Sequence, residues 1–432
     1  MNVGAALLEL GHEAPQQLAV VAYKRTRGVA RKEAPRTETN YASLCDRAVR
    51  IALGFRQSGL VPGDRVSVFV RPSADLVAVT WAAFLEGLVP VFIDPGLARP
   101  ALLSAIERTA PRAMVGVREA QLARRIFPRS FRSIERSFLV GSRRLPFLGR
   151  SLDKLCRSFT TRDVDGFTAR EMPDDAPAAI LFTSGSTGPA KGVLQTHASL
   201  RAQVDALQEL FAFRRGEADL AGLPAFALFA PAFGLTAVFP DMDPTQAEKC
   251  DPARLANAIL ENETSNAFGS PTIWKRLVPW CRERGVRFES LERVLIAGAA
   301  VPPALLEDLA SLLPNTAEIH TPYGATEALP VASIRGSEIG ALDSRPGKGT
   351  CVGRPAGAEV RLIEVRDEVI ADFSEAREVA NGEVGEICVR GPFVSAAYAD
   401  LPEATKRAKI RDAANPSQVW HRMGDLGSID AD

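Results

Sequence analysis

The sequence predicts an α/β protein with two doubly wound βαβ subdomains, followed by a small β-rich, barrel-like subdomain. Two observations predict this fold class. Short apolar runs alternate with segments of helical periodicity between residues 41 and 328, which implies parallel strands joined by right-handed crossovers. Beyond residue 331, short runs of alternating polarity replace the helical segments, as is typical of antiparallel strands. The 432 residues exceed the roughly 250 to 300 at which single cores stop growing, so several compact units are expected.

The first βαβ unit begins with a helix at residues 41–56, where apolar residues recur at helical spacing. A Pro-Gly-Asp turn then leads into "RVSVFV", residues 65–70, which predicts a buried strand. Residues 73–86 predict an amphipathic helix, and "VPVFIDP", residues 89–95, predicts the next buried strand.

A second series of strands and helices begins with the apolar run at residues 178–182. It continues to the predicted strands at residues 293–298 and 317–328. After it, "EVRLIEV" (359–365) and "GEICVRG" (385–391) predict antiparallel strands of a small barrel or sheet. The predicted subdomains are therefore residues 1–175, 176–330 and 331–432.

A basic segment interrupts the first subdomain. Residues 121–157 carry ten Lys or Arg residues against two acidic ones, with four phenylalanines interleaved. One interpretation is a solvated surface insertion with a few anchoring phenylalanines. The other is a surface that docks on an anionic membrane or on a partner protein.

Bulk composition excludes several classes of protein. Basic and acidic residues balance at 52 each, and 46% of positions are apolar, so the chain is neither a nucleic-acid binder by bulk charge nor disordered. Six scattered cysteines without a C-x-x-C pair, and only four histidines, argue against a disulfide framework and a zinc site. Neither an export leader nor an apolar run of ~18 residues occurs, so a cytoplasmic protein is expected.

The stretch "TSGSTGPAKG", residues 183–192, has the layout of a phosphate-binding loop. Hydroxyl and backbone N–H groups can surround an anion, glycines allow close approach, and Lys191 supplies charge. The common pattern G-x-x-x-x-G-K-[ST] fails, because Ala190 precedes Lys191 and Gly192 follows it. The loop therefore indicates another kind of nucleotide-binding family.

Four motifs in order resemble the adenylate-forming superfamily of acyl-CoA synthetases, adenylation domains and luciferases. The loop at 183–192 is similar to the first signature of that superfamily and "YGATE" (323–327) to its second. "NGEVGEICVRG" (381–391) is similar to the third and "WHRMGDLGSID" (420–430) to the fourth. The resemblance covers nearly the whole chain and implies the large N-terminal domain of such enzymes.

The resemblance implies chemistry with ATP and Mg²⁺, in which positioning and electrostatics bring a carboxylate to the α-phosphate. The implied catalytic residues are Lys191, Thr326 at the α-phosphate, and Glu327 as the Mg²⁺ ligand. Tyr323 is expected to stack on adenine and Asp425 to accept hydrogen bonds from the ribose. Singly, each residue also fits an ordinary turn or helix-terminal role. The expected nucleotide-binding set is Thr183, Ser184, Gly185, Ser186, Thr187, Gly188, Lys191, Gly298, Ala299, Ala300, Tyr323, Gly324, Thr326 and Asp425.

The acyl site departs from the pattern L-P-x-F-H of many fatty-acyl relatives, because Ala227 stands where the histidine would fall. Phe226, Phe229 and Phe233 suit a wide apolar acyl site, with plain core packing as the alternative. This variant resembles the β-lactone synthetases of bacterial long-chain olefin biosynthesis. The resemblance implies a long-chain 2-alkyl-3-hydroxy acid as substrate, and neighbouring enzymes of that pathway as partners.

Relatives continue past the fourth signature into a small mobile C-terminal domain, which is expected to be absent here because the chain ends at Asp432. Two alternative functions remain open. One is a long-chain fatty acyl-CoA or acyl-AMP ligase, and the other is an inactive scaffold that binds nucleotide and lipid. No residue is assigned as the base for the β-hydroxyl group.

Overall fold

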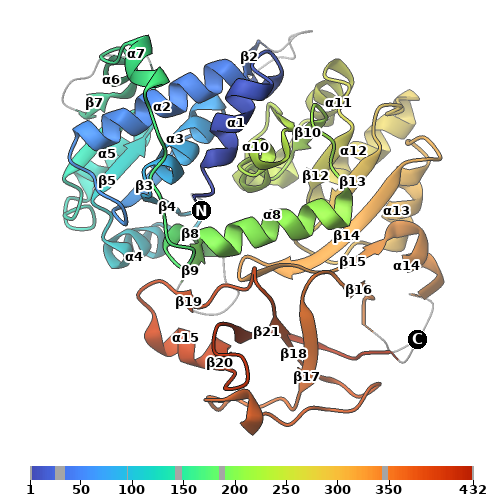
Figure 1. Cartoon of the computed structure of the whole chain (residues 1–432). Coiled ribbons are helices and arrows are strands. Elements are labelled where there is room, and N and C mark those ends of the chain that lie inside the picture. The colour runs from blue at the N-terminus through green and yellow to red at the C-terminus, as the bar shows by residue number, and fades with distance from the viewer. Residues whose placement is uncertain are drawn as a thin grey trace.

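The computed structural model describes residues 2–24, 35–94, 96–141, 148–183, 190–342 and 349–430. Three sheets organise these residues: an eight-stranded and a nine-stranded sheet that are mainly parallel, and a four-stranded antiparallel sheet. Figure 1 shows the two large sheets side by side, with helix α8 (His197–Phe211) running across their boundary and the small sheet below. The predicted α/β class is confirmed. Within the described ranges, none of the helices is long and apolar enough to cross a membrane.

The eight-stranded sheet contains the first predicted βαβ unit and both strands that flank the phosphate loop. Its order is β19-β9-β8-β4-β3-β5-β6-β7, and β3 pairs in parallel with both β4 and β5. The strands are β3 (Arg65–Phe69), β4 (Val89–Phe92), β5 (Ala113–Gly116), β6 (Arg136–Leu139), β7 (Arg150–Ser151), β8 (Pro177–Thr183), β9 (Lys191–Thr196) and β19 (Ala397–Tyr398).

The nine-stranded sheet includes the N-terminal pair of strands, β1 and β2, at one edge. Its order is β16-β15-β14-β13-β12-β10-β11-β1-β2. Strand β1 pairs in parallel with β11, with Val21 opposite Val238, so the two subdomains exchange strands at the start of the chain. The strands are β1 (Leu18–Tyr23), β2 (Arg36–Asn40), β10 (Ala218–Ala221), β11 (Thr236–Phe239), β12 (Asn266–Gly269), β13 (Arg293–Ile296), β14 (Glu318–Ala325), β15 (Ala328–Arg335) and β16 (Arg354–Pro355).

Helix α3 (Ala74–Leu85) is buried on nearly all sides, although residues 73–86 predict an amphipathic helix. Ten of its 12 residues are buried, because it packs against α2 (Tyr41–Gln57) and the strands beneath. The other α-helices are α1 (Ala5–Glu13), α4 (Arg99–Thr109), α5 (Arg118–Ile126), α6 (Leu152–Cys156), α7 (Thr161–Asp165), α9 (Pro224–Ala227), α10 (Ala230–Phe233), α11 (Pro252–Glu261), α12 (Pro271–Arg284), α13 (Pro303–Ala310), α14 (Gly336–Leu342) and α15 (Pro402–Ala408).

The third unit is a four-stranded antiparallel sheet ordered β17-β18-β21-β20, and the order runs from one edge strand to the other. The expected barrel-like unit is therefore an open sheet. Its own small core includes Trp420, whose ring stacks on Phe373 with centroids 4.2 Å apart. The strands are β17 (Glu359–Ile363), β18 (Gly385–Arg390), β20 (Lys409–Arg411) and β21 (Val419–Gly427).

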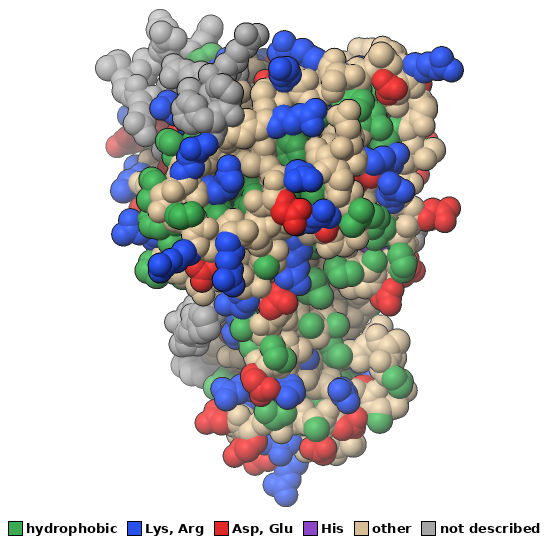
Figure 2. Space-filling model, turned by 90° about the vertical axis from the view of Figure 1, so that its left-hand side faces the viewer, with side chains coloured by type: hydrophobic (Ala, Val, Ile, Leu, Met, Phe, Trp, Pro, Cys, Tyr) green, Lys and Arg blue, Asp and Glu red, His purple; other side chains and the backbone are tan. Residues whose placement is uncertain are grey.

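The described part of the basic segment 121–157 belongs to the eight-stranded sheet. It supplies β6 and β7 at one edge, and buried Phe138 packs edge-on against Phe55 with ring centroids 5.3 Å apart. Arg143, Arg144 and Phe147 lie outside the described residues. Figure 2 shows many Lys and Arg side chains over the upper part of this side of the molecule. Within the segment, Arg129, Arg132 and Arg136 are exposed, so it combines the buried Phe138 with basic surface residues.

Candidate active site

The predicted phosphate loop joins two paired strands. Strand β8 ends at Thr183 and β9 begins at Lys191, and these two residues are opposite each other in the ladder. The predicted contacts of Ser184, Gly185, Ser186, Thr187 and Gly188 stay predictions, because these residues lie outside the described ranges. The pairing brings the two ends of the loop together, and Lys191 lies at its exit.

Lys191, Glu327 and Tyr398 form the centre of the candidate site. The Tyr398 hydroxyl donates a 2.8 Å hydrogen bond to Glu327 Oε1, and Lys191 Nζ lies 5.2 Å from the centroid of the tyrosine ring. Tyr398 reaches both because β19 pairs with β9, which places it opposite Val193. Burial, followed by the Glu327 carboxylate, raises the pKa of Tyr398 well above its usual value. Tyr398 is therefore a permanent donor that orients the 8% exposed Glu327.

A second amine, that of buried Lys409, lies near the same tyrosine. Its Nζ is 5.8 Å from the Tyr398 ring centroid and donates a 3.0 Å hydrogen bond to Ser395 Oγ. The Ser395 N–H donates to the main-chain carbonyl of Glu327 at 2.8 Å. Burial lowers the pKa of Lys409 to about 7, although the Glu327 carboxylate acts in the opposite direction. The segment 395–398 therefore holds Glu327 by both its carboxylate and its backbone.

Thr326 lies in the turn between β14 and β15 and is partly buried. Its carbonyl oxygen accepts a 2.8 Å hydrogen bond from Gln195 Nε2. Gln195 is held in turn by Ser199, whose hydroxyl donates to Gln195 Oε1 at 2.8 Å. Strand β9, which starts with Lys191, thus also positions the turn that carries Thr326 and Glu327.

Tyr323 and Asp425 meet where the nine-stranded sheet approaches the small sheet. The Tyr323 hydroxyl, from β14, donates a 2.7 Å hydrogen bond to Asp425 Oδ2, from β21. Burial, followed by the Asp425 carboxylate, raises the pKa of Tyr323 well above its usual value. The residues expected at the adenine and the ribose are therefore direct neighbours.

Backbone geometry accounts for glycine at two positions of the predicted nucleotide site, Gly324 and Gly298. A Cβ at Gly324 would lie 2.7 Å from the Ala328 carbonyl oxygen, so the turn excludes any side chain there. Gly298 has φ of +93°, and an added Cβ would meet no described atom within 4 Å. Ala299 and Ala300 follow it as exposed residues of the loop after β13. This loop offers an open, small-residue surface of the kind that a flat ring needs.

Glu327 supplies the donor type that Mg²⁺ prefers, a carboxylate oxygen. Mg²⁺ is usually held by one or two carboxylates together with substrate phosphates, and it keeps several waters. Among the residues that the structure describes, no group of three or more His, Cys, Asp or Glu side chains is placed to hold a metal ion. The donor set therefore fits an ion shared between Glu327 and a bound nucleotide.

Phe226, Phe229 and Phe233 line one cavity of about 30 Å³ between α8 and the strands of the nine-stranded sheet. The Phe226 ring stacks on Phe268 of β12, with centroids 3.7 Å apart. All three predicted rings also pack against hydrophobic core clusters. The cavity and the core-packing interpretations are therefore both consistent with the structure.

The sequence motifs did not single out Tyr398, Gln195 or Lys409. Tyr398 follows the end of the third signature, Gly391, by seven residues, so a longer motif window would have included it. Gln195 and Lys409 act through contacts between distant segments. His320 lies six residues before Thr326 along β14. Buried His421 is opposite Lys409 in the β20–β21 ladder, and its Nδ1 lies 3.1 Å from the Ala408 carbonyl oxygen. Burial, followed by the charge of Lys409, lowers the pKa of His421.

Comparisons with known proteins agree with this arrangement. The AMP-binding enzyme family matches residues 11–399. A Stenotrophomonas maltophilia protein named olefin β-lactone synthetase is 41% identical over 436 residues, covering 100% of this chain and 77% of the relative. A feruloyl-CoA synthase of Amycolatopsis is 28% identical over 412 residues, covering 92% of this chain and 72% of the relative.

Solved structures support the fold. A long-chain-fatty-acid-CoA ligase (FadD1) from Archaeoglobus fulgidus has a TM-score of 0.80 at 21% identity, covering 100% of this chain and 82% of that structure. The N-terminal domain of FACL13 from Mycobacterium tuberculosis has a TM-score of 0.78 at 20% identity, covering 100% and 98%. The resemblance stated from the motifs is confirmed, and the chain belongs to the AMP-binding enzyme family of adenylate-forming ligases.

Proposed function

We propose that this enzyme uses ATP and Mg²⁺ to activate a long-chain 2-alkyl-3-hydroxy acid as an acyl adenylate, and then closes a β-lactone. The observation that carries the proposal is the joint placement of Lys191, Tyr398 and Glu327 at the exit of the phosphate loop. The 41% identity to a protein named olefin β-lactone synthetase supports the lactone as product. The phenylalanine-lined cavity supports an apolar acid as substrate.

In the adenylation step, Lys191 would bind the phosphates that leave as pyrophosphate, and Thr326 would lie at the α-phosphate. Glu327, oriented by Tyr398, would hold Mg²⁺, which neutralises charge on the phosphate oxygens when bound. Tyr323 would stack on adenine, and the neighbouring Asp425 would accept hydrogen bonds from the ribose. The acid carboxylate then bonds to the α-phosphorus, and the bond from that phosphorus to pyrophosphate breaks.

In the second step, the β-hydroxyl oxygen of the substrate bonds to its own acyl carbon. The bond from that carbon to the phosphate oxygen breaks, AMP leaves, and the hydroxyl proton is lost. An attacking group on the same molecule has a high effective molarity once the site holds it against the carbonyl. No thiol is required for this step, which separates the reaction from thioester formation.

The first test is product analysis by NMR. The protein is incubated with ATP, Mg²⁺ and a long-chain 2-alkyl-3-hydroxy acid, with and without coenzyme A. A β-lactone with AMP in the absence of thiol is the expected result. A thioester that forms only with coenzyme A would establish the alternative, a long-chain acyl-CoA ligase, which the similarity in fold to such ligases favours. ATP binding without either product would favour an inactive nucleotide- and lipid-binding scaffold.

The second test separates binding from turnover. Glu327→Gln should abolish pyrophosphate release while ATP binding stays detectable by calorimetry, because the amide keeps the shape and loses the charge that holds Mg²⁺. Glu307→Gln, at an exposed position of α13, is the matched control and should behave as the wild type. Normal pyrophosphate release by Glu327→Gln would contradict the proposal.

Enzymes that supply the hydroxy acid and consume the lactone are the proposed partners, since direct transfer would protect a strained ring from hydrolysis. The basic segment 121–157, in which Arg129, Arg132 and Arg136 are exposed, is the proposed contact. Charge reversal at Arg129 and Arg132, which border an open surface hollow, should then weaken co-purification with those enzymes without altering ATP binding.

A further inference from the structure

The phenylalanine-lined cavity has one polar wall. Nine of its ten lining residues are apolar, and the tenth is Asp219 of β10. The cavity of about 30 Å³ has room for a water molecule or for the last atoms of a hydrocarbon chain. An acyl site needs apolar walls, so the carboxyl group is the feature that the proposed function does not explain.

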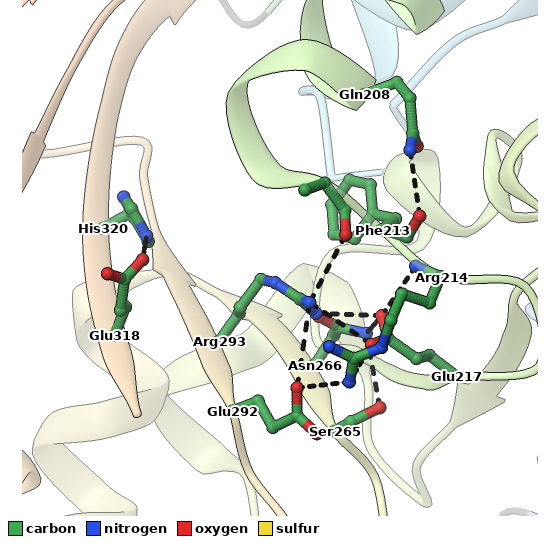
Figure 3. A network of polar contacts seen from close by, with 11 residues as sticks. Gln208, Phe213, Arg214, Glu217, Ser265, Asn266, Glu292, Arg293, Glu318 and His320 are labelled. Atoms are coloured by element: carbon green, nitrogen blue, oxygen red, sulfur yellow. Dashed lines mark hydrogen bonds and ion pairs between the residues drawn. The ribbon is translucent and has the colours of Figure 1, made fainter. Parts of the chain in front are cut away.

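The Asp219 carboxyl group has no hydrogen bond or ion pair with any other residue in the described part of the chain. Burial alone raises its pKa to about 7. Glu217, two residues earlier on the same strand, accepts hydrogen bonds from Arg293 at 2.9 Å and from Asn266 at 3.0 Å. Figure 3 shows these three side chains pointing toward one another near Phe213. Arg293 is therefore paired with Glu217, and the Asp219 carboxyl group lines the cavity without a described hydrogen-bond partner.

The position of Asp219 in the sheet shows how deep this polar wall lies. Asp219 is opposite Asn266, Asn266 is opposite Arg293, and Arg293 is opposite Glu318, so all four residues lie on one row across the sheet. Tyr323, expected at the adenine, lies five residues beyond Glu318 along β14, or about 17 Å at ~3.3 Å per residue.

This depth separates Asp219 from the reacting groups. About 17 Å corresponds to roughly a dozen carbon atoms of an extended chain, given C–C bonds of ~1.5 Å. The β-hydroxyl group of a 2-alkyl-3-hydroxy acid is next to the reacting carboxylate and cannot reach so far. Asp219 therefore meets the far end of the acyl chain, and it is not the base for ring closure.

A layer of packed side chains lies beneath the cavity. Arg293 Cζ lies 6.0 Å from the centroid of the Phe213 ring, and Phe213 packs on Phe233 with centroids 5.0 Å apart. Phe213 and Phe233 both line the cavity, so the Arg293–Glu217 pair supports its inner end. A longer chain cannot extend past this layer without breaking a buried ion pair.

We infer that Asp219 is a specificity-determining residue of the acyl site: its carboxyl group forms a polar floor that disfavours chains long enough to reach it. This inference rests on the proposed function, since it assigns the cavity to the acyl chain. A shorter chain leaves space for a water that can bond to the carboxyl group. A chain that reaches the floor expels that water and leaves the carboxyl group without a partner.

The test is a chain-length series with three variants. Binding of 2-alkyl-3-hydroxy acids with saturated chains of increasing length is measured by calorimetry, and pyrophosphate release gives kcat and KM for each acid. With Asp219→Leu, which makes the floor apolar without opening space, chains that reach the floor should bind about tenfold more tightly. This gain should appear in KM, with kcat and the values for shorter chains unchanged. Asp219→Asn keeps a polar floor and should keep the wild-type profile. Asp205→Leu, at an exposed position of α8, is the control and should also keep it.

Two results would overturn the inference. One is a length profile of Asp219→Leu that matches the wild type, and the other is an equal change with Asp219→Asn and Asp219→Leu. Failure of the proposed function is a different outcome: the wild type would then release no pyrophosphate with any acid. The calorimetric series would still report whether Asp219 sets the length of the chains that bind.

Discussion

Replacing Asp219 by asparagine should stabilise the protein at alkaline pH, and this advantage should shrink as the pH falls. Burial raises the pKa of the Asp219 carboxyl group from its ordinary 3.8 to about 7. The folded state therefore binds this proton more tightly than the unfolded state, and unfolding between these two pKa values releases it. The stabilising contribution is fully present below the unfolded-state pKa and is lost as the pH rises through 7.

The magnitude follows from the size of the shift. Each pH unit between the two pKa values changes the free energy of unfolding by about 1.4 kcal/mol. From pH 5 to pH 8, the free energy of unfolding of the wild type should therefore fall by roughly 3 kcal/mol relative to that of Asp219→Asn. The change is confined to the two pH units between pH 5 and the folded-state pKa of about 7. Other titrating groups are common to both proteins and cancel in the difference.

The assay is urea unfolding of both proteins at several pH values, following the transition that unfolds the nine-stranded sheet containing β10. The expected result is a difference in unfolding free energy that grows from pH 5 to pH 7 and then levels off. Asp205→Asn, at an exposed position, serves as the control and should show a difference close to zero throughout. A difference between wild type and Asp219→Asn that does not vary with pH would refute the assignment of Asp219 as a carboxyl group without a partner whose pKa is raised by its surroundings.

Three further predictions concern the candidate site. Tyr398→Phe removes the hydrogen bond to Glu327 Oε1, and one such bond is worth ~0.5–1.5 kcal/mol. The Mg²⁺ concentration for half-maximal pyrophosphate release should rise roughly 3- to 10-fold, and an unchanged midpoint in a Mg²⁺ titration would argue against the orienting role. Tyr323→Phe removes the donor that orients Asp425 and should weaken ATP binding by a similar factor in calorimetry, whereas unaltered affinity would remove Asp425 from the ribose site. Lys409→Met removes a buried amine whose pKa is lowered to about 7, so that the unfolded state binds its proton more tightly. From pH 6.5 to pH 9, the free energy of unfolding of the wild type should therefore rise by roughly 2 to 3 kcal/mol relative to that of this variant. A difference in unfolding free energy that stays constant with pH, in thermal or urea unfolding, would contradict this.

Much of the fold could be predicted because the signals are local. The helix expected at 41–56 is α2 (Tyr41–Gln57), and the strand expected at 65–70 is β3 (Arg65–Phe69). Periodicity and turn residues act over one or two turns of chain, so they are readable without tertiary contacts. The amphipathic character expected for 73–86 was wrong, because α3 is packed on nearly every side and its apolar residues need no single face.

Local sequence patterns could not predict that the two large sheets exchange strands. Strand β1 joins β11 more than 200 residues away, and β19 joins β9 at a similar separation. Apolar alternation predicts that a strand exists, but it does not predict which edge the strand extends. The small unit was likewise predicted as strands, while closure into a barrel or an open sheet depends on how the edge strands are arranged.

Motifs along the chain are sufficient to indicate the family and the residue types expected at the candidate site: a lysine after a glycine-rich loop, a carboxylate proposed for Mg²⁺, and a tyrosine and an aspartate proposed for the nucleoside. Tertiary structure alone decided which groups hold these residues in place. Tyr398 bonds to Glu327 across 71 positions of sequence, and Gln195 bonds to the Thr326 carbonyl across 131. The polar floor at Asp219 is also a tertiary property, because a carboxyl group on a short strand becomes unusual only when five phenylalanines from distant segments surround it. The physical reason is the same in each case: burial and hydrogen-bond partners depend on distances in space, and sequence motifs record only distances along the chain.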